Sequence, residues 1–168
     1  MELVVGVNGV LICGERRYPC VLGRSGVSLD KREGDGATPV GRFTLRRVLY
    51  RPDRLAPPIT GLPLIPLSPW DGWCDAPDHP DYNRPVRLPH PASCESLWRE
   101  DGVYDVIVVL GHNDDPPQPG MGSAIFMHVA RPQGQPTEGC VALALPDLLE
   151  ILSHIDTNGS LTVKTSSL

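Results

Sequence analysis

The sequence predicts a mainly β protein, and three observations support this prediction. The 168 residues include 19 Pro and 17 Gly, which shorten regular elements and multiply turns. The longer apolar runs have the length of strands, as in "YDVIVVLG" at 104–111. Amphipathic helical spacing is clear only at 145–152. A chain of this length buries enough surface for one core, so we expect a single domain over 1–168.

The first third is expected to form a meander of strands. Residues 2–7 and 10–13 are apolar runs joined by Asn8-Gly9, a pair typical of two-residue hairpin turns, and 17–23 is expected to add a strand. A glycine-rich loop then leads into a strand from about 42 to 50. The side chains expected to face inward from that strand are Phe43, Leu45 and Val48.

Residues 51–95 contain 11 prolines, which exclude long helices there. We expect a shaped loop region, and its aromatic residues Trp70, Trp73 and Tyr82 indicate that it packs on the rest of the domain or forms a wall for a ligand. The segment 92–100 is expected to form a short helix.

The last third is expected to supply the central strands and a covering helix. Strands are predicted at 104–111, 123–130 and 160–165, and a helix at 145–152. Pro146 and Asp147 are typical of a helix start. Alternation in the strand at 123–130 puts one set of side chains on a common face, namely Ala124, Phe126 and His128.

Charge and cysteine content exclude several classes of protein. The net charge of −5 gives no overall electrostatic signal for nucleic acid. No apolar run of about 18 residues is present, so no membrane insertion is expected, and the start lacks the pattern of an export signal. Five cysteines without C-x-x-C spacing argue against a closed zinc site or a complete disulfide framework. They are Cys13, Cys20, Cys74, Cys94 and Cys140.

The stretch "MHVARPQGQPTEGCVAL" at 127–143 carries His128 and Cys140 at the two ends of an eleven-residue loop. A thiol is a useful nucleophile as the thiolate, and a neighbouring imidazole is a common means of producing one. The backbone amides of Gly139 and Cys140 are candidate donors to an oxyanion. Spacing alone leaves a second interpretation open, in which His128 is a structural strand histidine and Cys140 a small buried residue.

A second motif, "GDGATPVGRF" at 34–43, precedes this stretch. The combination with "TEGCVAL" at 137–143 and the following helix resembles the L,D-transpeptidase catalytic domain (YkuD-type), in which T-P-x-G-x-F precedes H…[ST]-H-G-C-[IV]. The resemblance covers about residues 20–155. It implies a mainly β, sandwich-like fold with one or two short helices. It also implies that Cys140 is the nucleophile, that His128 is the base, and that the carbonyl of Val129 holds the imidazole tautomer.

The same resemblance implies a peptidoglycan stem peptide as substrate, attacked by the cysteine without a cofactor. It implies carbapenems as inhibitors and the periplasm or cell envelope as the place of action, although the start of this chain gives no export signal and leaves a cytoplasmic role open. The acceptor, the donor stem length and the oligomeric state are not predicted by the sequence.

Two positions depart from the family pattern. Glu138 stands where a histidine is usual, and Ala142 where an arginine is usual. A carboxylate at 138 is expected to raise the pKa of Cys140, and Arg131 to restore positive charge. The predicted substrate-binding residues are Arg131, Thr137 and Glu138.

Other candidate residues have alternative interpretations. Asp114 and Asp115 either bind a cation or a substrate amine or form a solvated turn. His112 is either a second base or a loop histidine. Arg84 either binds a substrate carboxylate or forms a surface ion pair. The segment "WCDAPDHPDYN" contains several ligand-type side chains, but their spacing matches no tetrahedral zinc pattern without further ligands, and no metal is expected. They are Cys74, Asp75, Asp78, His79 and Asp81.

Three functions therefore remain at the level of sequence. The first is an L,D-transpeptidase with an amine acceptor. The second is an L,D-carboxypeptidase or endopeptidase that uses the same Cys-His pair with water. The third is a non-catalytic cell-wall binding module, in which Glu138 marks a lost site.

Overall fold

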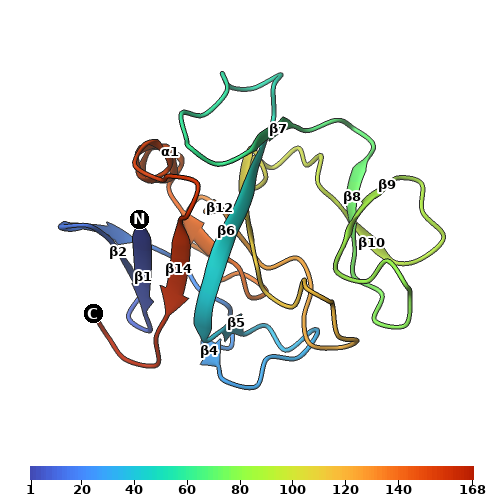
Figure 1. The fold of residues 1–168 in the computed structure, drawn as a ribbon, viewed down its shortest axis with the longest axis horizontal. Helices are drawn as coiled ribbons and strands as arrows, with labels where there is room; N and C mark the ends of the chain where they lie inside the picture. The colour runs from blue at the N-terminus through green and yellow to red at the C-terminus, as the bar shows by residue number, and fades with distance from the viewer.

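The largest sheet is a curled sheet of nine strands in the computed structural model, which describes residues 1–168 (Figure 1). Its strand order is β13-β12-β11-β6-β14-β1-β2-β3, and β7 pairs with β6. The predicted mainly β class is confirmed, with a single helix, α1. The elements are β1 (Glu2–Gly6), β2 (Val10–Cys13), β3 (Arg16–Pro19), β4 (Val27–Ser28), β5 (Thr38–Pro39), β6 (Gly41–Tyr50), β7 (Leu64–Pro66), β8 (Asp71–Cys74), β9 (Pro85–Arg87), β10 (Cys94–Ser96), β11 (Val106–Leu110), β12 (Phe126–Val129), β13 (Val141–Leu143), α1 (Leu145–Ser153) and β14 (Ser160–Val163).

The predicted N-terminal hairpin is present, but its loop has three residues because Gly6 pairs with Val10. Gly9 closes the loop with φ of +71°, a conformation that favours glycine. The expected strand at 17–23 is shorter than predicted: β3 ends at Pro19. The residues that follow form only isolated bridges to the other end of the sheet.

These bridges close the sheet on itself. The amide of Val21 donates to the carbonyl oxygen of Ala142 (2.8 Å), and the amide of Ala142 donates to the carbonyl oxygen of Val21 (2.9 Å). The chain just after β3, at one edge, therefore meets β13, at the other edge. The closed sheet surrounds the larger hydrophobic core, to which the three predicted side chains of β6 contribute: Phe43, Leu45 and Val48.

Helix α1 packs into the same core through Leu148, Ile151 and Leu152. It begins as the sequence predicts, because Pro146 has no N–H to leave unpaired in the first turn and Asp147 places negative charge near the helix N-terminus. None of the helical structure has the length and apolar character needed to cross a membrane.

A three-stranded sheet, β10-β8-β9, lies beside the opposite face of the main sheet (Figure 1). Its Trp73 packs edge-on against Phe126 of β12, with ring centroids 5.0 Å apart, within a second hydrophobic core. Tyr82 is buried as well, whereas Trp70 is 55% exposed. The prolines of 51–95 thus shape a packed lobe, and Trp73 and Tyr82 serve as its anchors.

The predicted helix at 92–100 is wrong, because Cys94–Ser96 forms β10 and pairs antiparallel with β8. Pairing with an existing strand satisfies the backbone groups of this short segment and outweighs its weak helical preference. The strand predicted at 104–111 is β11, and the strand predicted at 123–130 is shortened to β12. Ala124 lies outside β12 because its φ of +53° is not an extended conformation.

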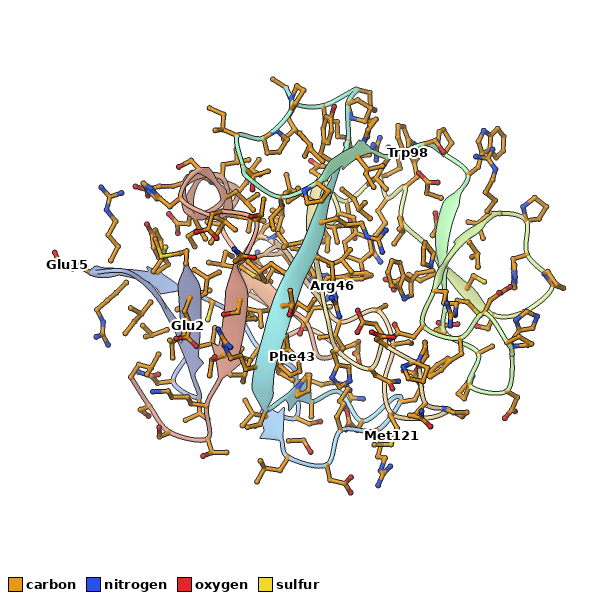
Figure 2. All side chains as sticks on the ribbon, viewed as in Figure 1. Glu2, Glu15, Phe43, Arg46, Trp98 and Met121 are labelled. Carbon is orange, nitrogen blue, oxygen red and sulfur yellow. The ribbon has the colours of Figure 1, made fainter.

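The loop after β11 is fixed by two side chains that Figure 2 labels on β6, Phe43 and Arg46. Phe43 packs edge-on against the ring of His112, with centroids 5.5 Å apart. Arg46 Nε lies 2.9 Å from Asp114 Oδ2. The two contacts give His112 and Asp114 a structural role in holding this loop against β6.

We expect Leu148→Ala to lower the free energy of unfolding by about 2–5 kcal/mol, because it leaves a cavity in the closed core. Urea denaturation monitored by circular dichroism measures the loss. The same truncation at the half-exposed Leu149 is the matched control and is expected to cost clearly less. Equal losses at both positions would contradict this description of the helix face.

Candidate active site

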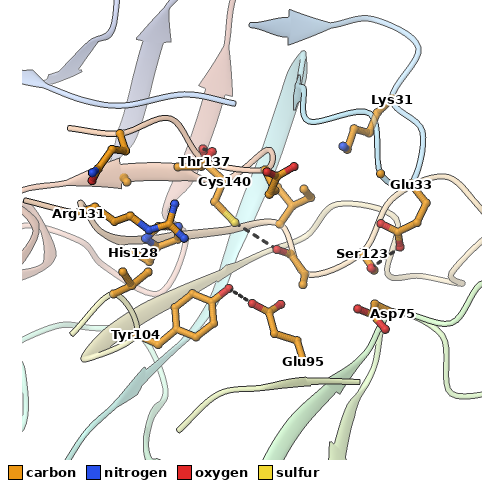
Figure 3. Close-up of a pocket in the computed structure, with 17 residues that line it drawn as sticks. Lys31, Glu33, Asp75, Glu95, Tyr104, Ser123, His128, Arg131, Thr137 and Cys140 are labelled. Atoms are coloured by element: carbon orange, nitrogen blue, oxygen red, sulfur yellow. Dashed lines mark hydrogen bonds between the residues drawn. The ribbon is translucent and has the colours of Figure 1, made fainter. Parts of the chain in front are cut away.

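The parallel pairing of β12 with β13 brings His128 and Cys140 to one face of the sheet. His128 pairs with Ala142, and Cys140 lies two residues before Ala142, so alternation points both side chains to the same side. Both side chains line one cavity, as Figure 3 shows. The predicted common face of Ala124, Phe126 and His128 agrees with this arrangement, since Ala124, Phe126 and Cys140 share the second core.

The thiol of Cys140 is held by two backbone groups. Its S–H donates to the carbonyl oxygen of Ala124 (3.2 Å), and its sulfur accepts the N–H of Phe126 (3.4 Å). The residue is only 8% exposed, and burial raises the pKa of the thiol to about 12. The resting side chain is therefore a neutral thiol at pH 7.

The imidazole of His128 is fixed in one tautomer. Its Nδ1 lies 2.9 Å from the carbonyl oxygen of Val129, which only accepts hydrogen bonds, so Nδ1 carries the proton and Nε2 has a free lone pair. Tyr104 packs against the ring with centroids 5.4 Å apart. Burial lowers the pKa of His128 to about 4, so the ring is neutral at pH 7. No hydrogen bond joins it to Cys140 in this resting arrangement.

The turn that carries the thiol is held by Thr137. Its hydroxyl donates to the carbonyl oxygen of Cys140 (2.7 Å) and accepts the N–H of Gly139 (3.1 Å). Gly139 has φ of +137°, and a Cβ there would lie 2.7 Å from the carbonyl oxygen of Ala37, so only glycine fits. The amide of Gly139 is thus occupied, whereas the amide of Cys140 makes no hydrogen bond.

The charges that act on Cys140 are not the ones that the sequence suggested. Glu138 is 76% exposed and pairs with Nε of Arg24 (3.0 Å), and the expectation that it raises the pKa of Cys140 is wrong. After burial, Glu95 is the carboxylate that raises this pKa, and Lys31 is the cation that lowers it. The charge of Arg131 acts instead on His128, whose pKa it lowers.

Lys31 and Glu95 are functional candidates that the motifs did not reveal. Lys31 is 6% exposed, forms an ion pair with Asp35 and lies beside Gly139. It is one of only two lysines in an arginine-rich chain, and this rarity is the one sequence feature that could have indicated the position. Glu95 accepts a hydrogen bond from the hydroxyl of Tyr104. Nothing in its sequence context indicates this position, because the segment was expected to be helical.

The cavity has a volume of about 270 Å³ and is lined by groups of both charges, among them Lys31 and Glu138. Three carboxylates, those of Glu33, Asp75 and Glu95, gather on one side, and Arg131 lies on the other side next to His128 (Figure 3). Asp75 Oδ1 is buried without a hydrogen-bond partner. Glu33 is held by the hydroxyls of Tyr82 and Ser123. The cavity is therefore suited to a ligand with a cationic group at one end and an anionic group at the other.

The structure places most of the predicted site residues together. The side chains that line the cavity with Cys140 and His128 include Arg131, Thr137 and Glu138. Gly139 and Val129 contribute through their backbones. His112 and Asp114 lie outside the cavity, Asp115 is exposed, and Arg84 lines a separate smaller cavity of about 120 Å³.

Comparison with known proteins identifies one family. The model of the L,D-transpeptidase catalytic domain (YkuD) matches residues 7–163, which is nearly the whole chain. A search of curated proteins finds no match.

Replacement of Thr137 tests the description of the turn. Thr137→Val keeps the shape but removes both hydrogen bonds and leaves the Gly139 amide and Cys140 carbonyl without this partner, which is expected to cost about 1–3 kcal/mol in unfolding free energy. Thr137→Ser keeps the hydroxyl and is the control. Thermal or urea denaturation measures both, and a Thr137→Val protein as stable as the wild type would refute the role of the hydroxyl.

A second prediction compares the effects of Glu138 and Lys31 on the reactivity of the Cys140 thiol. Glu138→Gln is expected to change the rate at which iodoacetamide alkylates Cys140 by less than about twofold, since an exposed ion pair contributes little. Lys31→Met is expected to slow alkylation, because it removes the cation that lowers the thiol pKa. Mass spectrometry of the Cys140 peptide over time measures both rates. A larger effect from Glu138→Gln than from Lys31→Met would contradict this assignment.

Proposed function

The chain belongs to the L,D-transpeptidase catalytic domain family, and from this premise we propose that it transfers an acyl group of a peptidoglycan stem peptide through a thioester on Cys140. One observation carries the proposal: Cys140 and His128, from adjacent parallel strands, share one cavity in which Nε2 of His128 has a free lone pair. A nucleophile and a base that face the same substrate cavity are what cysteine acyl transfer requires.

The first step is attack of the thiol on the substrate. A thiol with pKa about 12 beside an imidazole with pKa about 4 does not exchange its proton at rest. The proton therefore passes from Sγ to Nε2 of His128 as the sulfur bonds to the carbonyl carbon between the L-centre of the diamino acid and the following D-alanine. The D-alanine amine takes the proton from Nε2 when it leaves.

The second step releases the acyl group. An amine of a neighbouring stem attacks the thioester, loses its proton to Nε2, and forms the new amide while the proton returns to the sulfur. The hydrogen bond from Nδ1 to the Val129 carbonyl keeps Nε2 aimed at the reaction in both steps and stabilises the transient imidazolium.

An oxyanion forms in each step and requires hydrogen-bond donors. The amide of Cys140 makes no hydrogen bond and is available as one donor. The amide of Gly139 becomes a second donor if it exchanges its bond to Thr137 for one to the oxyanion. The buried Lys31, beside Gly139, adds positive potential on this side of the cavity.

The charge division of the cavity supports a stem peptide as ligand. The ammonium group of a diamino acid pairs with the wall formed by Glu33, Asp75 and Glu95, where Asp75 Oδ1 lacks a partner. The C-terminal carboxylate of the stem pairs with Arg131 on the other side, where a guanidinium binds it in bidentate fashion.

Cys140→Ala is expected to abolish covalent acylation by a disaccharide-tetrapeptide or by a carbapenem, because the thioester cannot form without the Cys140 thiol. Intact-protein mass spectrometry measures the adduct, and Cys20→Ala, which removes a thiol that does not line the cavity, is the control. An undiminished adduct on Cys140→Ala would refute the proposal. Analysis of the soluble products identifies the acceptor: cross-linked or exchanged stems support transfer to an amine, and tripeptides alone would replace that step with hydrolysis.

The fall of the acylation rate at low pH tests the protonation state of His128. Only neutral His128 accepts a proton, and its pKa is lowered from 6.5 to about 4, so the neutral form persists below pH 5. Acylation by a carbapenem is expected to stay near its pH 7 rate at pH 5 and to fall towards pH 4, with circular dichroism to verify folding. A decline centred near pH 6.5 would contradict the buried, neutral histidine.

A further inference from the structure

A second group of reactive side chains lies in the three-stranded sheet, outside the active-site cavity. Cys74 of β8, Cys94 of β10 and His90 of the preceding turn place their ligand atoms within 4.8 Å of one another. Cys74 and Cys94 are direct register partners, so their side chains stand on the same face of the sheet. The nineteen residues between them hide this pairing from any search for C-x-x-C spacing.

We propose that Cys74, His90 and Cys94 bind a Zn²⁺ ion. Two thiolates and an imidazole are a donor set that zinc prefers. Zn–S bonds of about 2.3 Å and Zn–N bonds of about 2.0 Å in a tetrahedron separate the donors by roughly 3.3–3.8 Å, so the side chains need to close by only about 1 Å. Binding releases the two thiol protons to solvent, and water takes the fourth position.

The surroundings of His90 support this site. Asp81 Oδ2 lies 3.1 Å from Nε2 of His90, and metal-bound histidines commonly donate the other ring N–H to a carboxylate. Nδ1 accepts a hydrogen bond of 3.2 Å from the amide of Ala92, which the ion would replace. The ring of His79 packs against that of His90, with centroids 4.9 Å apart. Asp81 is therefore an orienting residue, and the partly exposed His90 and Cys94 give an entry path.

The ion would tie together the two strands that carry part of the active-site wall. Asp75 follows Cys74 and Glu95 follows Cys94, and both carboxylates line the cavity. Cross-linking β8, β10 and the turn at His90 fixes these carboxylates relative to Cys140 and stabilises the lobe. This role is independent of the reaction that the cavity catalyses, and it is tested by metal binding alone.

The test is a titration of the reduced, metal-free full chain with Co²⁺, which replaces zinc and gives a thiolate-to-cobalt absorption band. We expect one equivalent to bind the wild type and Cys140→Ala alike. Asp81→Asn is expected to weaken binding by about 10- to 100-fold. Cys94→Ser is expected to weaken it further and to abolish the rise in melting temperature that zinc gives. Cys20→Ser, at another half-buried cysteine, is the matched control and keeps both effects.

Several results would overturn the proposal. If the reduced wild type shows no band, Cys74 and Cys94 do not bind the ion and are only a pair of neighbouring thiols that can form a disulfide. A band that survives in Cys94→Ser, or that is lost in Cys140→Ala, places the ion elsewhere. Circular dichroism of Cys94→Ser verifies that the variant folds, so a loss of metal is not mistaken for unfolding.

Discussion

The parallel pairing of β12 with β13 is the constraint on which the site depends. It sets Cys140 two residues from Ala142, the register partner of His128, and so gives the thiol and the imidazole one common face. A shift of the register by one residue would point the side chain of Cys140 to the other face of the sheet, into the other core. The pairing is secured on its far side by the two hydrogen bonds between Ala142 and Val21, which also close the sheet. The same contacts therefore define both the fold and the geometry of the nucleophile.

Burial decides the electrostatic state of the pair. The low-polarity environment raises the thiol pKa to about 12 and lowers the imidazole pKa to about 4, and the nearest charges, Glu95 and Lys31, oppose each other at the sulfur. The pair thus rests without separated charge, and in the proposed mechanism the proton moves from the thiol only as the sulfur attacks a carbonyl carbon. Burial therefore keeps the thiol of Cys140 protonated at rest.

Patterns local in the sequence predicted much of the fold. The spacing of Leu148 and Leu152 predicted α1, and the apolar pattern predicted the inward face of β6. The two motifs pointed to Cys140 and His128, which the structure places at one cavity. The failures concern long-range pairing. The segment at 92–100 forms a strand only because β8 lies beside it, and this pairing brings Glu95 to the cavity.

Side-chain direction was equally beyond the sequence. Glu138 is adjacent to the Gly139-Cys140 turn in the chain, yet its carboxylate turns outward to Arg24. Lys31, more than a hundred residues before Cys140, supplies the nearby positive charge instead. Sequence proximity to a nucleophile is therefore a poor guide to its electrostatics, which depend on how separate segments fold onto the same turn.

The resting site holds a neutral thiol and a neutral imidazole protonated on Nδ1. Nitrogen-15 NMR of the histidine rings, with His128 assigned by His128→Gln, measures this state directly at pH 7. We expect one protonated and one unprotonated ring nitrogen in His128, with the proton on Nδ1 and no change between pH 7 and pH 5. An imidazolium signal from His128 at pH 7, lost in Cys140→Ala, would reveal a preformed thiolate–imidazolium pair and contradict the account.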